Sequence, residues 1–407
     1  MKNTANHYRE AKEIYAEYGV DTDKALQEMD MVPISVHCWQ IDDLSGFENP
    51  HGKMTGGIAA TGNAGGKPES EEEFFKQLKK ALDLIPGAKK VATHAVYRSA
   101  KGKPVGRDEI LPEHFENWVE FAKKQGVALD FNPTYFSHEK SESGFTLSSA
   151  DEGIRQFWVE HGKRSRKIGE FFGRELGVPC ITNHWIPDGY KDITVDKLAP
   201  RERLVKSLDE ILAEPIDRQY QVDSLESKLF GLGVESYTVG SHEFYTNYCS
   251  LTGKAIVCMD AGHFHPTESV AAKLSSYLAF GQEVMLHVSR PVRWDSDHVV
   301  ILDEETKAIM EEIARQKAYQ KVHIGLDYFD ASINRIAATA IGGRSTKKAL
   351  LLAMLEPVER LKEIERSGNF AKRLALLEEV KTLPFGFVWD QYCEMHHCPG
   401  AEWLESL

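Results

Sequence analysis

The sequence predicts an α/β protein built on a closed (β/α)8 barrel, the TIM-barrel architecture, with an N-terminal helix and a C-terminal helical extension. Eight short runs rich in Val and Ile recur along the 407 residues, and most are followed by an amphipathic stretch of helical length. Polar and aromatic side chains stand at the end of nearly every run. An open, doubly wound sheet shows the same alternation and stays the alternative, because a strand count does not prove closure.

The predicted strands are near-continuous apolar runs of four to eight residues, the pattern of strands that are buried on both faces. Residues 90–97 (KVATHAVY) and 284–289 (VMLHVS) are clear examples. The fifth run, around residues 226–229, is the weakest. In chain order the runs cover residues 32–39, 90–97, 127–132, 178–185, 226–229, 255–260, 284–289 and 322–327.

Helical stretches lie between these runs. Residues 71–84 (EEEFFKQLKKALDL) place Phe74, Leu78 and Leu82 on one face of a helix. Residues 112–124 begin with a proline, which suits the first turn of a helix. The same periodicity predicts helices at residues 154–173, 201–212, 267–280 and 304–320.

Two segments fall outside the barrel. Residues 1–30 predict one leading helix, and the chain from Ser345 onward contains helical patterns only. The predicted division is therefore a catalytic barrel with its leading helix at residues 1–344 and a helical extension at residues 345–407. The extension is expected to pack on the barrel or on a neighbouring subunit.

Composition narrows the classes of function. The net charge of −13 argues against nucleic-acid partners and against anionic membranes. The sequence has no apolar run of the roughly 20 residues that a membrane helix needs, and its polar N-terminus lacks the apolar core of a signal peptide. The six scattered cysteines suit reduced thiols. A cytoplasmic protein is therefore predicted, with neither a nucleic-acid nor a membrane partner.

Two motifs suggest other chemistry and are set aside. Residues 62–68 (GNAGGKP) superficially resemble a phosphate-binding loop, but Thr61 and Pro68 stand where that pattern needs Gly and Ser or Thr. The segment from Cys393 to Cys398 (CEMHHC) suggests a zinc site, but no second segment supplies the remaining ligands. The interpretation preferred for this segment is a helix end at the surface.

Carboxylates gather where the predicted strands end, and in a barrel all these ends face one mouth. Each aspartate alone is more often a helix cap or a turn residue, but five negative charges in one low-dielectric mouth need compensation. Two divalent cations together with Lys228 supply it. His287 and either His263 or His265 add nitrogen ligands, and spacing does not choose between the last two. The carboxylates are Glu226, Asp260, Asp295, Asp297 and Asp327.

Aromatic rings at the same strand ends predict a sugar site. Trp39, Phe131 and Trp185 each stand at or near the end of a predicted strand. Any one of them is more often a core residue, but together they are typical of walls that cover the apolar face of a pyranose. Lys228 and two arginines are the only evident basic groups nearby, so a neutral polyol is favoured over a sugar phosphate.

With these motifs in view, the sequence resembles the L-rhamnose isomerase family, aldose–ketose isomerases whose barrel is of the xylose isomerase type. The resemblance runs from about residue 8 to Leu407 and rests on long motifs rather than a short pattern. These are SVHCWQIDDLSGFENP, NHWIPDGYKDITVDKLAPR, ESKLFGLGVESYTVGS, DAGHFHPTE, HVSRPVRWDSDHVV and HIGLDYFDASINRIAA.

The resemblance implies two cation sites in each subunit. It selects His263 over His265 as a ligand, and it implies Mn²⁺ as the cofactor, with Co²⁺, Zn²⁺ or Mg²⁺ as alternatives. It also implies a cytoplasmic homotetramer. The site nearer the chemistry is formed by His263, Asp295 and Asp297, and the other by Glu226, Asp260, His287 and Asp327.

The resemblance also places Lys228 and His94 near the substrate. The expected reaction is the interconversion of L-rhamnose and L-rhamnulose, in L-rhamnose breakdown, by a metal-mediated 1,2-hydride shift. Catalytic roles are expected for Lys228, His94, Asp295 and Asp327, with His94 acting in ring opening or orientation because it is the one unliganded base in reach. A two-metal epimerase or hydrolase on the same barrel and a non-catalytic sugar-binding protein are the alternatives.

Overall fold

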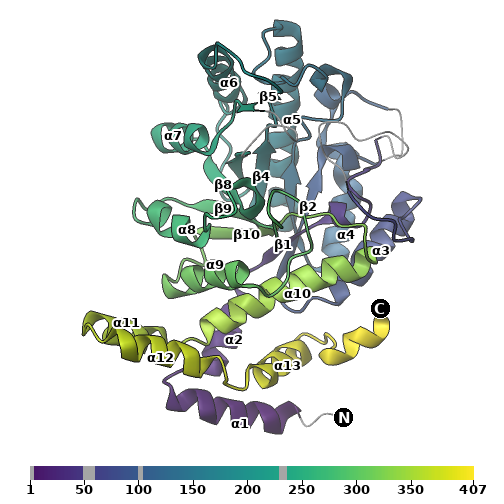
Figure 1. The fold of residues 1–407 in the computed structure, drawn as a ribbon. Helices are drawn as coiled ribbons and strands as arrows, with labels where there is room; N and C mark the ends of the chain where they lie inside the picture. Colours follow the sequence, from purple (N-terminus) through teal and green to yellow (C-terminus); the bar gives the residue numbers. More distant parts are fainter. Residues whose placement is uncertain (1–3, 49–59, 100–103, 229–235) are drawn as a thin grey trace.

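The computed structural model describes residues 4–48, 60–99, 104–228 and 236–407. Its core is a closed barrel of parallel strands in the order β1-β10-β9-β8-β6-β4-β3-β2 (Figure 1). The predicted (β/α)8 barrel is therefore confirmed, and the open-sheet alternative is wrong. The barrel strands are β1 Ile34–His37, β2 Lys89–His94, β3 Ala128–Asn132, β4 Cys180–Trp185, β6 Gln221–Glu226, β8 Ile256–Asp260, β9 Val284–Val288 and β10 Val322–Leu326.

Helices surround the barrel (Figure 1). Ser70 caps helix α3 (Glu71–Asp83) by accepting a hydrogen bond from the Glu73 amide, and Asp303 caps helix α9 (Glu304–Arg315) in the same way. A small antiparallel pair, β5 (Gly189–Tyr190) and β7 (Tyr237–Thr238), lies outside the barrel. The helices are α3 Glu71–Asp83, α4 Glu116–Gln125, α5 Glu152–Leu176, α6 Leu198–Ile211, α7 His242–Thr252, α8 Ala271–Leu278, α9 Glu304–Arg315 and α10 Arg335–Met354.

Three elements differ from the sequence prediction. The leading helix is two helices, α1 (Thr4–Glu17) and α2 (Thr22–Asp30), because the Asp21 side chain caps a new helix. The fifth barrel strand, β6, ends at Glu226 instead of beginning there. Its interior residue Asp223 is buried in an ion pair with Arg166, so the strand lacks the apolar run by which the others are recognised. Helix α7 is rich in aromatic residues and was not predicted.

The C-terminal extension consists of helices, as predicted. Helix α10 passes through position 345 without a break. The division of the chain into a barrel and an extension at this position stays a prediction. Helix α13 lies beside α1 beneath the barrel (Figure 1), which brings the two ends of the chain together. The later elements are α11 Val358–Arg366, α12 Phe370–Val380, α13 Phe385–Met395 and a final 3-10 helix at Ala401–Ser406.

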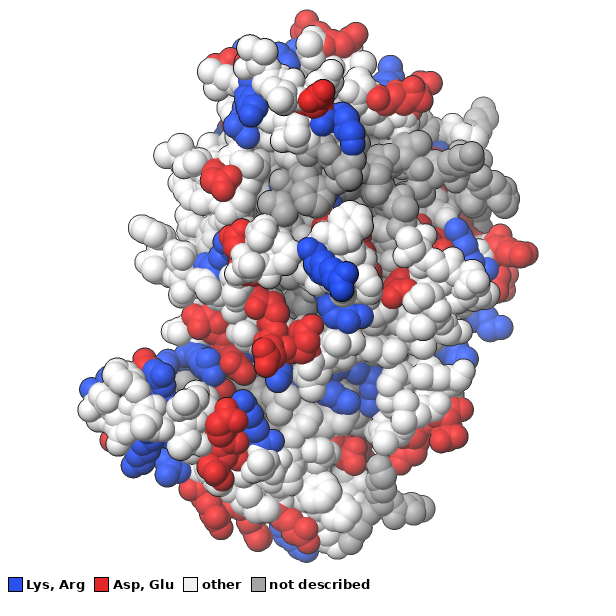
Figure 2. All heavy atoms as spheres, in the orientation of Figure 1, with Lys and Arg blue, Asp and Glu red and all other residues white. Residues whose placement is uncertain are grey.

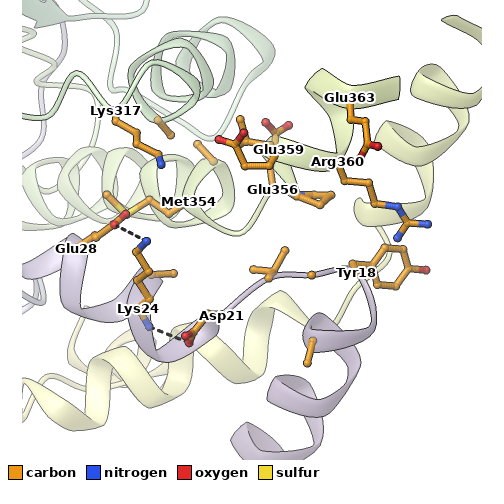
Figure 3. A pocket seen from close by; sticks show the side chains of 18 of the residues that line it. Tyr18, Asp21, Lys24, Glu28, Lys317, Met354, Glu356, Glu359, Arg360 and Glu363 are labelled. Atoms are coloured by element: carbon orange, nitrogen blue, oxygen red, sulfur yellow. Dashed lines mark hydrogen bonds and ion pairs between the residues drawn. The ribbon is translucent and has the colours of Figure 1, made fainter. Parts of the chain in front are cut away.

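A cleft of about 640 Å³ lies where α1, α2 and α9–α11 meet. Figure 3 shows Lys317, Glu356 and Glu359 among the side chains that line the cleft. Arg360 lies 6.0 Å from the ring of Tyr18. The cleft is on the side of the barrel where the strands begin, because Lys317 shortly precedes β10. Among the described residues that line it, none belongs to the predicted site.

Charged side chains of both signs are interspersed over the face of the molecule shown in Figure 2, rather than gathered in a basic stripe. In the part of the chain that the structure describes, no helix has both the length and the apolar character required to cross a lipid bilayer.

Candidate active site

Four predicted ligands converge at the mouth of the barrel. Glu226 ends β6, Asp260 ends β8, His287 lies near the end of β9, and Asp327 follows β10 directly. The parallel register places Asp260 opposite His287 on neighbouring strands. One ligand atom from each of the four side chains lies within 4.8 Å of the others. The chain therefore builds one compact group of three carboxylates and an imidazole.

Neighbouring side chains hold these carboxylates in place. The indole nitrogen of Trp39 donates a hydrogen bond of 2.9 Å to Asp327 Oδ1. Asn183 Nδ2 donates one of 2.6 Å to Glu226 Oε2, and Ser224 Oγ fixes that amide by donating to Asn183 Oδ1 at 2.7 Å. These hydrogen bonds fix the orientation of both carboxylates. Asp327 has its Oδ2 atom 3.4 Å from His287 Nδ1, whereas Glu226 has Oε2 beside His287 and Oε1 beside His263.

The residues of this group fit a bound cation. Glu226 Oε1 and both ring nitrogens of His287 are buried without a hydrogen-bond partner, although His287 Nδ1 lies 3.2 Å from Glu226 Oε2. Burial, followed by repulsion from Asp327 and Glu226, raises the pKa of Asp260 well above its usual value. A buried acid that resists ionisation beside other carboxylates, as Asp260 does, is stabilised by a divalent cation, which supplies positive charge at the shared centre.

A second group lies on the far side of Glu226. His263 Nδ1 is 3.3 Å from Glu226 Oε1, and His263 Nε2 is 3.5 Å from Asp295 Oδ2. His263 is buried, whereas His265 is exposed and lies against Thr267. Spacing did not choose between these two histidines, but the structure places His263, and not His265, beside the acids. The short 3-10 helix after β8 turns the His263 side chain into the mouth.

Lys228 stands among the acids of this second group. Its ammonium forms an ion pair with Asp295 and lies 3.3 Å from His263 Nε2. Burial opposes the charge on Lys228, but Asp295 and Asp297 outweigh it, so the pKa of Lys228 is raised. Burial and the nearby carboxylate of Asp295 raise the pKa of Asp297 well above its usual value. In this arrangement the lysine neutralises part of the charge that a cation would otherwise meet.

Gly262 is required by the close packing at this site. A Cβ atom at Gly262 would lie 2.7 Å from Asp295 Oδ1 and 3.0 Å from Ser289 Oγ. Neither neighbour is free to move away, because Asp295 is paired with Lys228 and Ser289 donates a hydrogen bond of 2.8 Å to Asp260. A side chain at position 262 would therefore displace residues of both groups.

An aromatic wall runs from the first group to the second. The Trp39 ring meets His94 edge-on at 4.7 Å, and His94 lies 5.8 Å from Phe136. Phe136 lies 5.2 Å from Trp185, and the ammonium of Lys228 stands 5.3 Å from the Trp185 ring. Since Trp39 also binds Asp327, the wall connects both clusters of acids and gives a sugar an apolar surface to lie against.

Phe131 is not part of this wall. Its ring packs edge-on against Phe115 and Phe172, at 5.2 and 5.9 Å, among the buried side chains between the barrel and its helices. The neighbouring residue Asn132 instead faces its cross-strand partners and donates to the Thr93 carbonyl. The placement of Phe131 at the sugar site is therefore corrected. Phe136, four residues beyond β3, is the ring that this segment brings to the mouth, and sequence analysis missed it.

His94 is buried in the wall as a neutral imidazole. Burial lowers its pKa to about 3, and its Nδ1 atom lies 3.2 Å from Thr134 Oγ1. The ring therefore carries one N–H and one lone pair at neutral pH, which is the state that both accepts and donates a proton.

Comparisons of the sequence with known proteins agree on one family. The family model described as L-rhamnose isomerase (RhaA) matches residues 2–407. The L-rhamnose isomerase of Escherichia coli strain SMS-3-5 is 56% identical over 398 residues, which cover 98% of this chain and 94% of that protein. The protein of the same name from Citrobacter koseri is 55% identical over the same shares. Among solved structures, an L-ribulose 3-epimerase aligns with a TM-score of 0.50 and 13% identity, covering 82% of this chain and 97% of that one; this likeness concerns the barrel fold alone.

Proposed function

The chain belongs to the L-rhamnose isomerase family, and we propose that it interconverts L-rhamnose and L-rhamnulose. The observation that carries the proposal is the convergence of Glu226, Asp260, His287 and Asp327 at the mouth of the barrel. An aldose–ketose isomerase needs groups that hold two adjacent sugar oxygens and polarise a carbonyl, and a paired acid cluster beside an aromatic wall suits this task.

We propose that two divalent cations bind in each subunit and that Mn²⁺ is the preferred ion. The ligand atoms are mostly carboxylate oxygens with one imidazole in each group, a set that suits Mn²⁺ and Co²⁺, with Mg²⁺ and Zn²⁺ as alternatives. When bound, the cations supply Lewis-acid polarisation of the sugar carbonyl. One site would use Glu226, Asp260, His287 and Asp327, and the other, nearer the reacting carbons, His263, Asp295 and Asp297.

The remaining residues bind and orient the sugar. Trp39 and Trp185 are the rings against which the apolar face of the sugar would lie. Lys228 would remain protonated and stabilise negative charge on a substrate oxygen. His94, held by Thr134, is the neutral base available to move a hydroxyl proton when the ring opens. Phe136 packs edge-on against both His94 and Trp185.

A test of the function is product analysis with protein stripped of cations by a chelator. We expect no turnover without added metal, and recovery best with Mn²⁺ or Co²⁺, with L-rhamnulose as the product of L-rhamnose. A two-metal epimerase would instead form an epimer of the sugar, and a binding protein would form no product. Full activity in protein shown by elemental analysis to be free of metal would contradict the proposal.

The hydrogen is proposed to pass directly between carbon 2 and carbon 1. An enediol route needs a free carboxylate or imidazole beside the substrate. The five carboxylates of the mouth are all assigned to cations, and His94, the remaining imidazole, is assigned to ring opening or orientation. In deuterated water we therefore expect the aldose formed from L-rhamnulose to carry little deuterium at carbon 2, as measured by NMR. Substantial incorporation would favour the enediol route, with His94 as the base.

We also propose that the protein is a homotetramer in the cytoplasm. The six cysteines are free and buried, which suits a reducing compartment, and the resemblance to the family supports the tetramer. Sedimentation equilibrium of the purified chain measures the assembly directly.

A further inference from the structure

Two cysteines meet at the C-terminal end of helix α13. The Cys398 amide donates to the Cys393 carbonyl at 2.9 Å, and the His397 amide donates to the Glu394 carbonyl at 3.1 Å. His397 adopts the left-handed conformation, with φ of 51°. These three features define a Schellman motif, in which the side chains of the first and last residues contact each other. The motif therefore places the Cys393 and Cys398 side chains together at the end of the helix.

Both sulfur atoms face a buried arginine. Arg344 of α10 places Nη1 3.7 Å from Cys398 Sγ and Nη2 4.0 Å from Cys393 Sγ. The same guanidinium donates to the carbonyls of Leu84 and Gly400, both at 2.8 Å, and to that of Pro399 at 3.1 Å. Because three backbone carbonyls fix the guanidinium, its charge cannot turn away from the sulfur pair.

The charge of Arg344 decides what kind of site this is. A guanidinium beside two thiols repels a metal cation, and among the described residues the segment is not one of the groups that converge as metal ligands. The same charge favours a thiolate. The adjacent thiol of Cys393 lowers the pKa of Cys398 to about 7 against the opposing effect of burial, and Arg344 and Lys89 add to the lowering. The Cys398 sulfur is also the nearer of the two to Arg344 and the more exposed, so Cys398 is assigned as the nucleophile of the pair.

We propose that Cys393 and Cys398 form a peroxide-sensitive dithiol that closes reversibly into a disulfide, at a place in the fold remote from the sugar site. The Cys398 thiolate attacks one oxygen of a hydroperoxide, the O–O bond breaks, and a sulfenic acid and hydroxide (or alkoxide) are formed. The Cys393 thiol then attacks the Cys398 sulfur, loses its proton, and releases water. The two sulfur atoms together give up two electrons, and the peroxide accepts these two electrons.

The small peroxide suits the burial of the pair. Cys398 is 7% exposed and Cys393 is 1% exposed, so a bulky disulfide reagent has little access, whereas hydrogen peroxide is close to water in size. The disulfide would fasten the end of α13 to the segment that carries Pro399 and Gly400. The carbonyls of both these residues already accept hydrogen bonds from Arg344.

The test is treatment of the folded, full-length chain with hydrogen peroxide, followed by thiol counting after denaturation and by peptide mapping without reductant. We expect the free thiols to fall from six to four, with a Cys393–Cys398 peptide that has lost two hydrogen atoms, and full recovery with dithiothreitol. Six free thiols after treatment, or a disulfide between other cysteines, would overturn the proposal.

Single variants separate the two steps. Cys393→Ser should stop at a sulfenic acid on Cys398, which dimedone traps when it is present as the chain is denatured, whereas Cys398→Ser should lose no thiol to peroxide. Cys249→Ser removes a lone buried cysteine and should form the disulfide as the wild type does, which makes it the matched control. If Cys398→Ser is oxidised as readily as the wild type, Cys398 is not the reacting thiolate. The wild-type chain tests disulfide formation without any variant, so the result still decides the proposal if one of the variants fails to fold.

Discussion

Asp297→Asn is expected to lower kcat by about 10²- to 10³-fold, the usual cost of removing one group that stabilises charge in the reaction, without loss of the fold. Asp297 lies in the loop after β9 and has φ of 46°, a conformation that asparagine tolerates well. Burial and repulsion from Asp295 already oppose a charge at this position. The metal-free variant should therefore be at least as stable as the metal-free wild type, while the stabilisation gained on adding Mn²⁺ should shrink. Steady-state kinetics and thermal unfolding with and without metal measure both effects.

Asp303→Asn is the matched control for this variant. Asp303 belongs to the same connection, but it caps α9 by accepting a hydrogen bond of 2.9 Å from the Thr306 amide. Its replacement should cost roughly 1 kcal/mol of stability or less and leave kcat unchanged. If Asp297→Asn instead unfolded while keeping normal turnover per folded molecule, Asp297 would be a structural residue and not a ligand.

The barrel and its acid clusters could be predicted from the sequence because both depend on local patterns. A strand buried on both faces is an apolar run, and the residue that ends it lies at the mouth whatever the neighbouring strands contain. Asp260, His287 and Asp327 were found in this way. Glu226 was not, because the fifth strand was predicted to begin at this residue, whereas β6 ends there.

What the sequence did not reveal depends on the face of a strand or the shape of a loop. Adjacent strand residues point to opposite faces, so a shift of one position separates Phe131, in the helix-facing core, from Asn132. Phe136 lies in an irregular loop, where no sequence pattern predicts the position of its side chain. Asn183 fixes Glu226 only because β4 and β6 pair in a register that sets Asn183 opposite Ser224.

Lys228→Met is expected to lower kcat by about 10²-fold while cation binding stays the same or becomes tighter. The ammonium of Lys228 pairs with Asp295 and lies 3.3 Å from His263 Nε2, so it competes with a cation for ligands of the second group. Methionine keeps the apolar stem beside Trp185 and removes only the charge. Two assays separate the effects, namely kcat at saturating Mn²⁺ and titration calorimetry of Mn²⁺ into metal-free protein.

Two further variants test whether the charge or its shape matters. Lys228→Arg keeps the charge but spreads it over a wider, planar group, so it should recover part of the lost kcat and leave Mn²⁺ binding close to that of the wild type. Lys254→Met removes a comparable lysine from a surface ion pair with Asp209 and should alter neither quantity. A Lys228→Met variant whose Mn²⁺ affinity falls in step with its kcat would contradict this role, because Lys228 would then be needed to build the metal site rather than to act beside it.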